Sequence, residues 1–318
     1  MTIIHCVSVS TGKDSGATAI VALETEPRES LRFVSADTGN EHENYHDYLG
    51  YMERHLGIKI DVLRANFDRE IAKKRTYVLT HWAGKGVPQA DIERAAAALV
   101  PTGNPFLDLC IWKGKFPSRT AQFCTQYLKT ELLTEYQLAF IERGEAEAVW
   151  SWQGVRIDES AARRKRLACP VHPSFHRTFD VVGAGLFNYR PILRWKAEDC
   201  FEAHRIAGLE PNPLYSQGMT RVGCMPCINA GKDEVLEISK RFPHHIERIE
   251  YWELMVGQAS KRQASSFFPD PDRDAHLDKR GIRKVVEWSK TKRGGQLMDW
   301  IRIHEEPKAC SSAYGLCE

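Results

Sequence analysis

The chain has 318 residues, of which 42% are hydrophobic and 27% charged, and its 44 Lys and Arg against 42 Asp and Glu give a net charge of +2. This composition is ordinary for a soluble globular protein, and the length allows one large domain or one domain with an appendage. The balanced charge argues neither for nor against nucleic acid as a partner. No apolar run approaches the roughly 20 residues that span a bilayer, and no basic segment with a long apolar core opens the chain, so we expect a cytoplasmic protein without a membrane partner.

Residues 3–23 are the first predicted unit, which consists of a strand, a polar turn and a helix. Residues 3–9 are rich in β-branched side chains, which suits a buried strand, and residues 16–23 have the apolar character of a helix. The turn between them consists of Ser10, Thr11, Gly12, Lys13, Asp14 and Ser15. Backbone N–H groups, hydroxyls and a lysine at a helix N-terminus predict a phosphate site. The alternative is an ordinary turn in which Ser15 or Asp14 caps the helix.

Strands and helices alternate after this unit. We expect strands over residues 31–35 and 59–63 and helices over residues 41–56 and 68–80, which together predict an α/β fold with a doubly wound parallel sheet. Asp37, Thr38 and Gly39 follow the second strand. Because open α/β sheets bind ligands at the carboxyl ends of their strands, we expect these residues to lie beside the first turn.

The second half of the chain is predicted from weaker patterns. Residues 80–105 read as a loop around a short helix at 95–99, and the later elements are helices over 121–143, 197–207 and 233–255, a strand over 150–157 and an irregular loop over 212–227. We expect residues 1–256 to form a nucleotide-binding domain. Residues 257–318 are expected to form a basic, helical extension.

Five separated motifs occur in an order that resembles the phosphoadenylyl-sulfate (PAPS) reductase family of the PP-loop, or adenine nucleotide alpha hydrolase, superfamily. They are the turn at 10–15, the segment 37–39, residues 154–160 (GVRIDES) with Arg163, residues 212–215 (NPLY) with 223–227 (GCMPC), and residues 116–118 (FPS) with Cys124 and Lys129. The resemblance covers about residues 3–255. It implies a doubly wound nucleotide-binding domain with a helical, cysteine-bearing C-terminal part.

The ending Lys13-Asp14-Ser15 is similar to the ATP-cleaving branch of this superfamily, whereas Thr11 departs from the usual glycine. Sulfonucleotide reductases bind a ligand without a β,γ-pyrophosphate, and their loop characteristically lacks this ending. The resemblance therefore implies that residues 10–15 hold the pyrophosphate of ATP and that Lys13 and Asp14 take part in catalysis. It further implies that residues 37–39 place the nucleotide or Mg²⁺, and that Arg156 and Arg163 contact the reacting phosphate.

The nine cysteines of a chain expected in the cytoplasm point to metal binding or catalysis more than to a disulfide framework. Cys224 and Cys227 form a C-x-x-C pair with the spacing of half a zinc or iron–sulfur site, and a redox pair has the same spacing. The resemblance adds Cys124 and implies a four-iron four-sulfur cluster. Cys310 and Cys317 are the candidates for its fourth ligand.

The activity that we expect is ATP-dependent adenylylation of an acceptor, with release of pyrophosphate, coupled to sulfur transfer. Its partners would be a sulfur donor such as a cysteine desulfurase, or a thioredoxin-like reductant, with DNA or another nucleic acid as a possible acceptor. One alternative is a phosphoadenylyl-sulfate reductase in which Cys317 attacks sulfur. A second is a non-catalytic nucleic-acid-binding module with the basic stretch at 279–293 as its contact. This stretch and a second basic run at 163–166 equally suit a solvated helix face.

Overall fold

A six-stranded sheet forms the centre of the structure, a computed structural model that describes residues 2–159, 161–167, 175–181, 184–219, 221–271 and 281–291. Its strand order is β3-β2-β1-β4-β6-β5, and all neighbours are parallel except the β5–β6 pair. The strands are β1 (Ile3–Ser8), β2 (Leu31–Asp37), β3 (Ile60–Arg64), β4 (Ala148–Trp152), β5 (Phe175–Val181) and β6 (Ala184–Tyr189). The predicted doubly wound parallel sheet is confirmed, and the antiparallel edge strand β5 is an addition that the sequence analysis missed.

The strand order reverses direction at β1. The chain runs outward from β1 to β2 and β3, then returns to place β4 on the other side of β1, where His5 pairs with Leu31 on one side and with Trp150 on the other. In open α/β sheets, ligands bind at such a switch point, outside the carboxyl ends of the strands. The loop after β1 and the segment after β4 therefore flank the expected position of a ligand.

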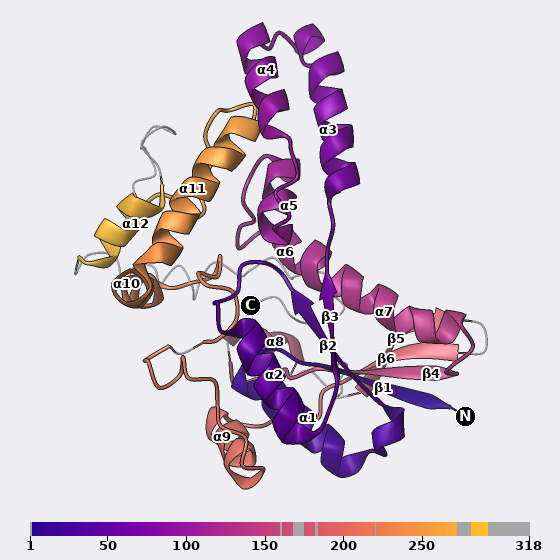
Figure 1. Ribbon diagram of the computed structural model, residues 1–318. Coiled ribbons are helices and arrows are strands. Elements are labelled where there is room, and N and C mark those ends of the chain that lie inside the picture. Colours follow the sequence, from indigo (N-terminus) through magenta and orange to yellow (C-terminus); the bar gives the residue numbers. More distant parts are fainter. Residues whose placement is uncertain are drawn as a thin grey trace.

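Helices cover both faces of the sheet, because successive side chains of a strand point to opposite faces. Val7 packs with residues of α1 (Lys13–Thr25) and α2 (Tyr45–Leu56). Its neighbour Cys6 packs on the other face with Phe140 of α7 (Glu131–Glu142). α9 (Ala197–Ile206) lies against α1 (Figure 1).

A helical unit projects from the sheet and has the largest hydrophobic cluster of the described chain (Figure 1). Its helices are α3 (Asp68–His81), α4 (Gln89–Ala98), α5 (Pro105–Lys113), α10 (Lys232–Arg241), α11 (Pro243–Ala259) and α12 (Ile282–Ser289). Phe267, Phe268 and Ile282 are part of this cluster, so the described residues beyond 256 pack on the same unit. The expected loop over 80–105 was wrong in part, because α4 occupies residues 89–98.

Two predicted helices are each divided in the structure. The helix expected over 233–255 is α10 followed by α11, since Pro243, which has no N–H to donate, begins the second helix. The helix expected over 121–143 begins as α6 (Phe123–Thr125), continues through a π-helical segment at Gln126–Thr130 and becomes regular only in α7. π-Helical turns are frequent at functional sites. This one lies between Cys124 and α7 and contains Lys129.

Within the described residues, none of the helices combines the length and the apolar character that crossing a bilayer requires. Cys310 and Cys317 lie outside the described residues, as do parts of the basic stretch at 279–293.

Candidate functional site

The turn between β1 and α1 is held closed by Ser15. The Ser15 hydroxyl accepts a hydrogen bond from the Ser10 backbone N–H at 3.0 Å and lies 2.9 Å from the carbonyl oxygens of Ser10 and Gly12. Ser15 and Thr11 are buried, whereas Ser10 is exposed. The structure therefore gives Ser15 a role in shaping the turn. Its predicted contact with a phosphate stays a prediction.

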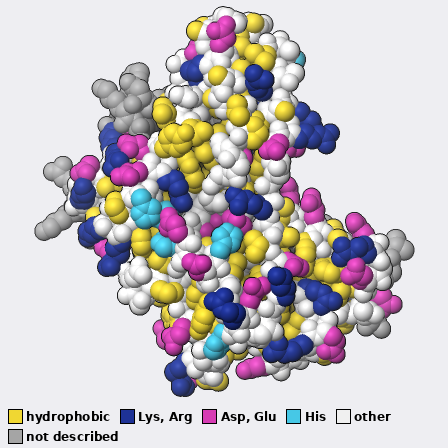
Figure 2. Space-filling view, viewed as in Figure 1, with side chains coloured by type: hydrophobic (Ala, Val, Ile, Leu, Met, Phe, Trp, Pro, Cys, Tyr) yellow, Lys and Arg dark blue, Asp and Glu magenta, His cyan; other side chains and the backbone are white. Residues whose placement is uncertain are grey.

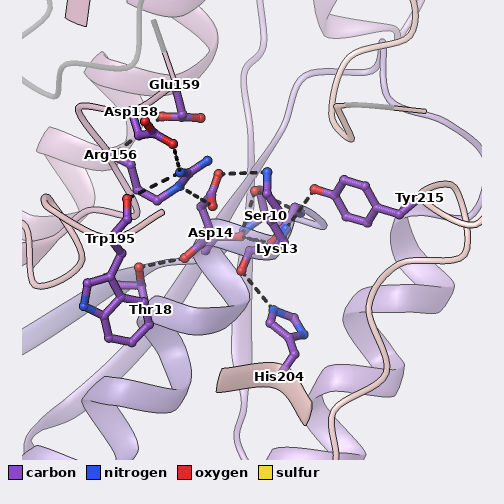
Figure 3. A network of polar contacts seen from close by, with 12 residues as sticks. Ser10, Lys13, Asp14, Thr18, Arg156, Asp158, Glu159, Trp195, His204 and Tyr215 are labelled. Carbon is purple, nitrogen blue, oxygen red and sulfur yellow. Dashed lines mark hydrogen bonds and ion pairs between the residues drawn. The ribbon is translucent and has the colours of Figure 1, made fainter. Parts of the chain in front are cut away.

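Lys13 is the first residue of α1, and two aromatic rings lie near its side chain. Its backbone N–H donates to the Tyr215 hydroxyl at 3.0 Å, and its ammonium lies 5.5 Å from the Tyr215 ring centroid and 5.9 Å from that of Phe201. The ammonium is also 3.5 Å from Asp14 Oδ2. Tyr215 belongs to the predicted motif at 212–215, so the structure brings two of the five motifs together (Figure 3).

A third motif reaches the turn through Arg156, which is 142 residues from Asp14 in the sequence. Arg156 Nε donates to Asp14 Oδ1 at 2.8 Å, and its side chain is only 3% exposed. Figure 3 shows the two side chains facing each other beside Lys13. Arg163 is buried and forms an ion pair with Glu159, whose carboxylate also accepts from the Arg156 backbone N–H.

Gly154 makes the approach of this motif possible. A Cβ atom at position 154 would lie 2.9 Å from the Asp14 carbonyl oxygen and 3.0 Å from Ser15 Cα, which are closer than real Cβ atoms come to backbone. Only a residue without a side chain fits there.

We expect Gly154→Ala to lower nucleotide affinity by at least about tenfold, because one of two backbone segments must move and carries Arg156 away from Asp14. The measurement is equilibrium binding of a nonhydrolysable ATP analogue. Gly84→Ala is the matched control, because a Cβ atom at position 84 would meet nothing within 4 Å. Equal affinities for the two variants would contradict the assigned packing.

His204 is a residue of this region that the sequence analysis did not identify. It is buried in α9, and its Nε2 lies 2.9 Å from the Lys13 carbonyl oxygen. The absence of a side chain at Gly16 leaves room for the ring, since a Cβ atom at that position would lie 2.5 Å from it. A contact between residues 191 positions apart has no signal in a single sequence.

Asp37 is the last residue of β2, Thr38 and Gly39 follow it, and the polar groups of this segment are engaged within the protein. Asp37 accepts from the Gly39 N–H at 2.8 Å and from Arg64 at 3.1 Å. The Thr38 hydroxyl donates to Glu41 at 2.6 Å. The expected roles of these residues toward ribose or Mg²⁺ stay predictions.

Cys124, Cys224 and Cys227 come together from two distant parts of the chain, around the ammonium group of Lys129. Burial raises the pKa of the Cys124 thiol to about 12 and that of Cys224 to about 11, and Lys129 opposes both shifts. In return, Cys224 is the largest of the influences that raise the pKa of Lys129 to about 12, and the other two cysteines and Glu41 add to it. The three thiols and the ammonium are therefore close electrostatic neighbours.

Glu41 connects the segment after β2 with the C-x-x-C loop, a role that the sequence analysis missed. Its Oε1 lies 3.9 Å from Cys224 Sγ, and residues 41 and 224 form a β-bridge. Beside it, the Met225 N–H donates to the Asn40 carbonyl oxygen at 2.7 Å. Burial raises the pKa of Glu41. No spacing pattern in the sequence signals this contact.

The described basic residues of the stretch at 279–293 form ion pairs with acidic groups. Arg283 pairs with Glu250 at 2.8 Å, Lys284 with Asp270 at 3.0 Å and Lys290 with Glu287 at 2.6 Å. Basic side chains that are paired with acidic ones in this way are typical of a solvated helix face and less typical of a surface that binds a phosphate backbone.

Of the five predicted motifs, the three between residues 116 and 227 lie within the segment that a known family model matches. The sequence model of the phosphoadenosine phosphosulfate reductase domain matches residues 110–230. An uncharacterised 37.8 kDa protein of Escherichia phage 186 is 41% identical over 335 residues, which is 99% of this chain and 97% of the phage protein. An uncharacterised protein of Methanocaldococcus jannaschii is 26% identical over 80% of this chain, which spans 42% of that relative.

Two solved structures show a more distant likeness. Phosphoadenylyl-sulfate reductase of Candida auris has a TM-score of 0.39 and 13% identity, covering 71% of this chain and 83% of its own. The U34-tRNA thiolase NcsA of Methanococcus maripaludis, solved with its 4Fe-4S cluster, has a TM-score of 0.35 and 12% identity, covering 91% of this chain and 82% of its own.

Proposed function

The chain belongs to the PAPS reductase family, and on that premise we propose that it is a PP-loop ATP pyrophosphatase that adenylylates an acceptor in sulfur transfer. The observation that carries the proposal is the placement of Lys13 at the start of α1 with Arg156 bound to the neighbouring Asp14 at 2.8 Å. Two cations beside a helix N-terminus, at the switch point of the sheet, favour a multiply charged anion such as the phosphates of ATP.

In the proposed reaction, an atom of the acceptor attacks the α-phosphorus of ATP. The bond between that phosphorus and the oxygen bridging to the β-phosphorus breaks, and pyrophosphate leaves with the electron pair. The Lys13 ammonium neutralises the charge that develops on pyrophosphate, and Arg156 stabilises the α-phosphate. Asp14 positions Arg156 through their charge-assisted hydrogen bond. A sulfur nucleophile from a donor protein, for example a cysteine desulfurase, then displaces AMP from the acceptor.

The cysteine group fits an iron–sulfur cluster. Three thiols from two separate segments act electrostatically on one ammonium, and a buried cation is costly unless an anionic group lies beside it. Cys124, Cys224 and Cys227 would hold the cluster, Lys129 would offset the negative charge of the thiolates and cluster, and Cys310 or Cys317 stays the proposed fourth ligand. Such a cluster supplies a site that binds or relays sulfur or electrons.

The products formed from ATP test this proposal. Incubation with ATP, Mg²⁺ and candidate acceptors, including DNA and tRNA, is expected to yield AMP and pyrophosphate. Formation of ADP and phosphate would overturn the proposal, because it places the bond cleavage at the γ-phosphate.

A PAPS reductase activity is the second candidate, and the domain matched over residues 110–230 favours it. Its assay is sulfite release from phosphoadenylyl sulfate in the presence of thioredoxin or another dithiol. Sulfite formation without any AMP formation from ATP would select this candidate over the adenylylating one.

A further inference from the structure

A second group of ligand-type side chains lies apart from the turn and the cysteines. His42 and Glu43 precede α2, and His244 and His245 lie in the first turn of α11. One ligand atom from each of His42, Glu43 and His245 lies within 4.8 Å of the others. Figure 2 shows histidine side chains beside an acidic one at the surface, on the side of α10 and α11. We propose that this group, the His–Glu cluster, binds a divalent transition metal ion of the zinc type.

The carboxylate of Glu43 lies at the centre of the cluster. Its Oε2 is 3.1 Å from His245 Nε2 and 3.5 Å from His42 Nε2, and its Oε1 is 3.1 Å from His244 Nε2. In a tetrahedral zinc site with bonds of roughly 2.0 to 2.1 Å, neighbouring ligand atoms are about 3.4 Å apart. The ligand atoms around Glu43 therefore already have nearly the separation that a bound zinc ion requires.

The chemical type of the ligand atoms indicates which metal ions the His–Glu cluster would bind. Imidazole nitrogens with one carboxylate suit Zn²⁺, Ni²⁺ or Cu²⁺, whereas Mg²⁺ prefers oxygen ligands and retains water. The His–Glu cluster is therefore distinct in chemistry from the Mg²⁺ expected on ATP. It is also distinct from the thiolate set of Cys124, Cys224 and Cys227, which suits a softer ion or a cluster.

The hydrogen bonds of the histidines indicate which of them can bind a metal through Nε2 most readily. His245 is fully buried, and its Nδ1 has no hydrogen-bond partner among the described residues, so the ring proton can reside there while Nε2 binds metal. His42 Nδ1 instead accepts the Asn44 N–H at 3.1 Å, which keeps the ring proton on Nε2. His42 must give up that bond to ligate through Nε2. We therefore expect Glu43 and His245 to contribute most to affinity and His42 least.

A metal ion in the His–Glu cluster would join the segment after β2 to α11. The same two segments already meet through Arg248 of α11, which donates to the Asn40 side chain at 3.2 Å and to the Met225 carbonyl oxygen at 2.7 Å. Glu41, two residues before Glu43, contacts Cys224. The metal would thus brace the segment that packs on the C-x-x-C loop, as a structural zinc does.

Zinc binding in a chain without the three clustered thiols tests the proposal directly. In the variant Cys124→Ser/Cys224→Ser/Cys227→Ser, titration calorimetry is expected to show one zinc site per chain. Adding Glu43→Gln and His245→Ala to this variant should weaken its zinc affinity by more than the roughly 10- to 100-fold that loss of an outer-shell partner costs. Adding His42→Ala instead should weaken the zinc affinity less. His81→Ala is the matched control, because His81 is exposed on α3, outside the cluster.

Cobalt spectra of the unaltered chain provide a second measurement if the cysteine variant does not fold. Nitrogen and oxygen ligands give Co²⁺ visible bands without the near-ultraviolet thiolate charge transfer, so His245→Ala should reduce the visible absorption and leave the charge-transfer band unchanged. Absence of zinc binding by the folded cysteine variant, or unchanged affinity in Glu43→Gln/His245→Ala, would overturn the proposal. In either case Glu43 would serve only as a hydrogen-bonded anion at the N-terminus of α11. Neither measurement depends on ATP turnover.

Discussion

Replacing Lys13 with alanine is expected to reduce formation of AMP and pyrophosphate by about 100-fold or more while leaving the fold intact. The ammonium lies at the start of α1, where in the proposed reaction it would stabilise the leaving pyrophosphate, and removing one such electrostatic contact typically costs roughly 100- to 1,000-fold in rate. Stability should change little, because a cation at a helix N-terminus makes no favourable interaction with the helix dipole. Rapid-quench analysis of radiolabelled nucleotide measures the rate, and thermal unfolding followed by circular dichroism monitors the fold.

Lys59→Ala is the matched control for Lys13→Ala, because Lys59 is exposed and directly precedes β3. We expect this variant to retain full activity. If Lys13→Ala turned over ATP as fast as Lys59→Ala does, the assignment of the turn as the pyrophosphate site would have to be abandoned.

Replacing Cys124 with serine is expected to remove most of the iron from anaerobically purified protein, together with a broad visible absorption. In the proposed cluster the Cys124 thiolate is a ligand, and a serine hydroxyl binds iron poorly at neutral pH. Iron and acid-labile sulfide per chain are the measured quantities.

Cys200→Ala is the control for Cys124→Ser. Cys200 is a buried thiol that packs with Ala17 and Ile192. Its substitution should leave the iron content unchanged. A colourless wild-type protein that is free of iron and still active would rule out the cluster.

Local sequence patterns correctly predicted the features that depend on residues close together in the chain. The polar turn with Lys13 between a strand and a helix, the strands over 31–35 and 59–63 and the end of α2 at Gly57, whose φ is +61°, were all readable from the sequence. The C-x-x-C pair was readable because its spacing is short.

Sequence patterns failed to predict the elements whose conformation is set by tertiary packing and not by local helix or strand preference. Residues 105–113 form α5, with Asn104 accepting from the Leu107 N–H as its cap, yet seven of the nine residues are buried and no amphipathic period is present. The strands β5 and β6 were also missed, and β5 lies antiparallel at the sheet edge.

The sequence by itself determined the alternating α/β order, the polar turn at 10–15 and the presence of cysteines with metal-site spacing, because each depends on neighbours a few residues apart. Only the tertiary structure decided that Arg156 contacts Asp14, that Cys124 meets Cys224 and Cys227 around Lys129, and that Glu43 lies among three histidines. The physical reason is that these contacts join segments about 100 to 200 residues apart, which the order of the strands and the packing of the helices bring together.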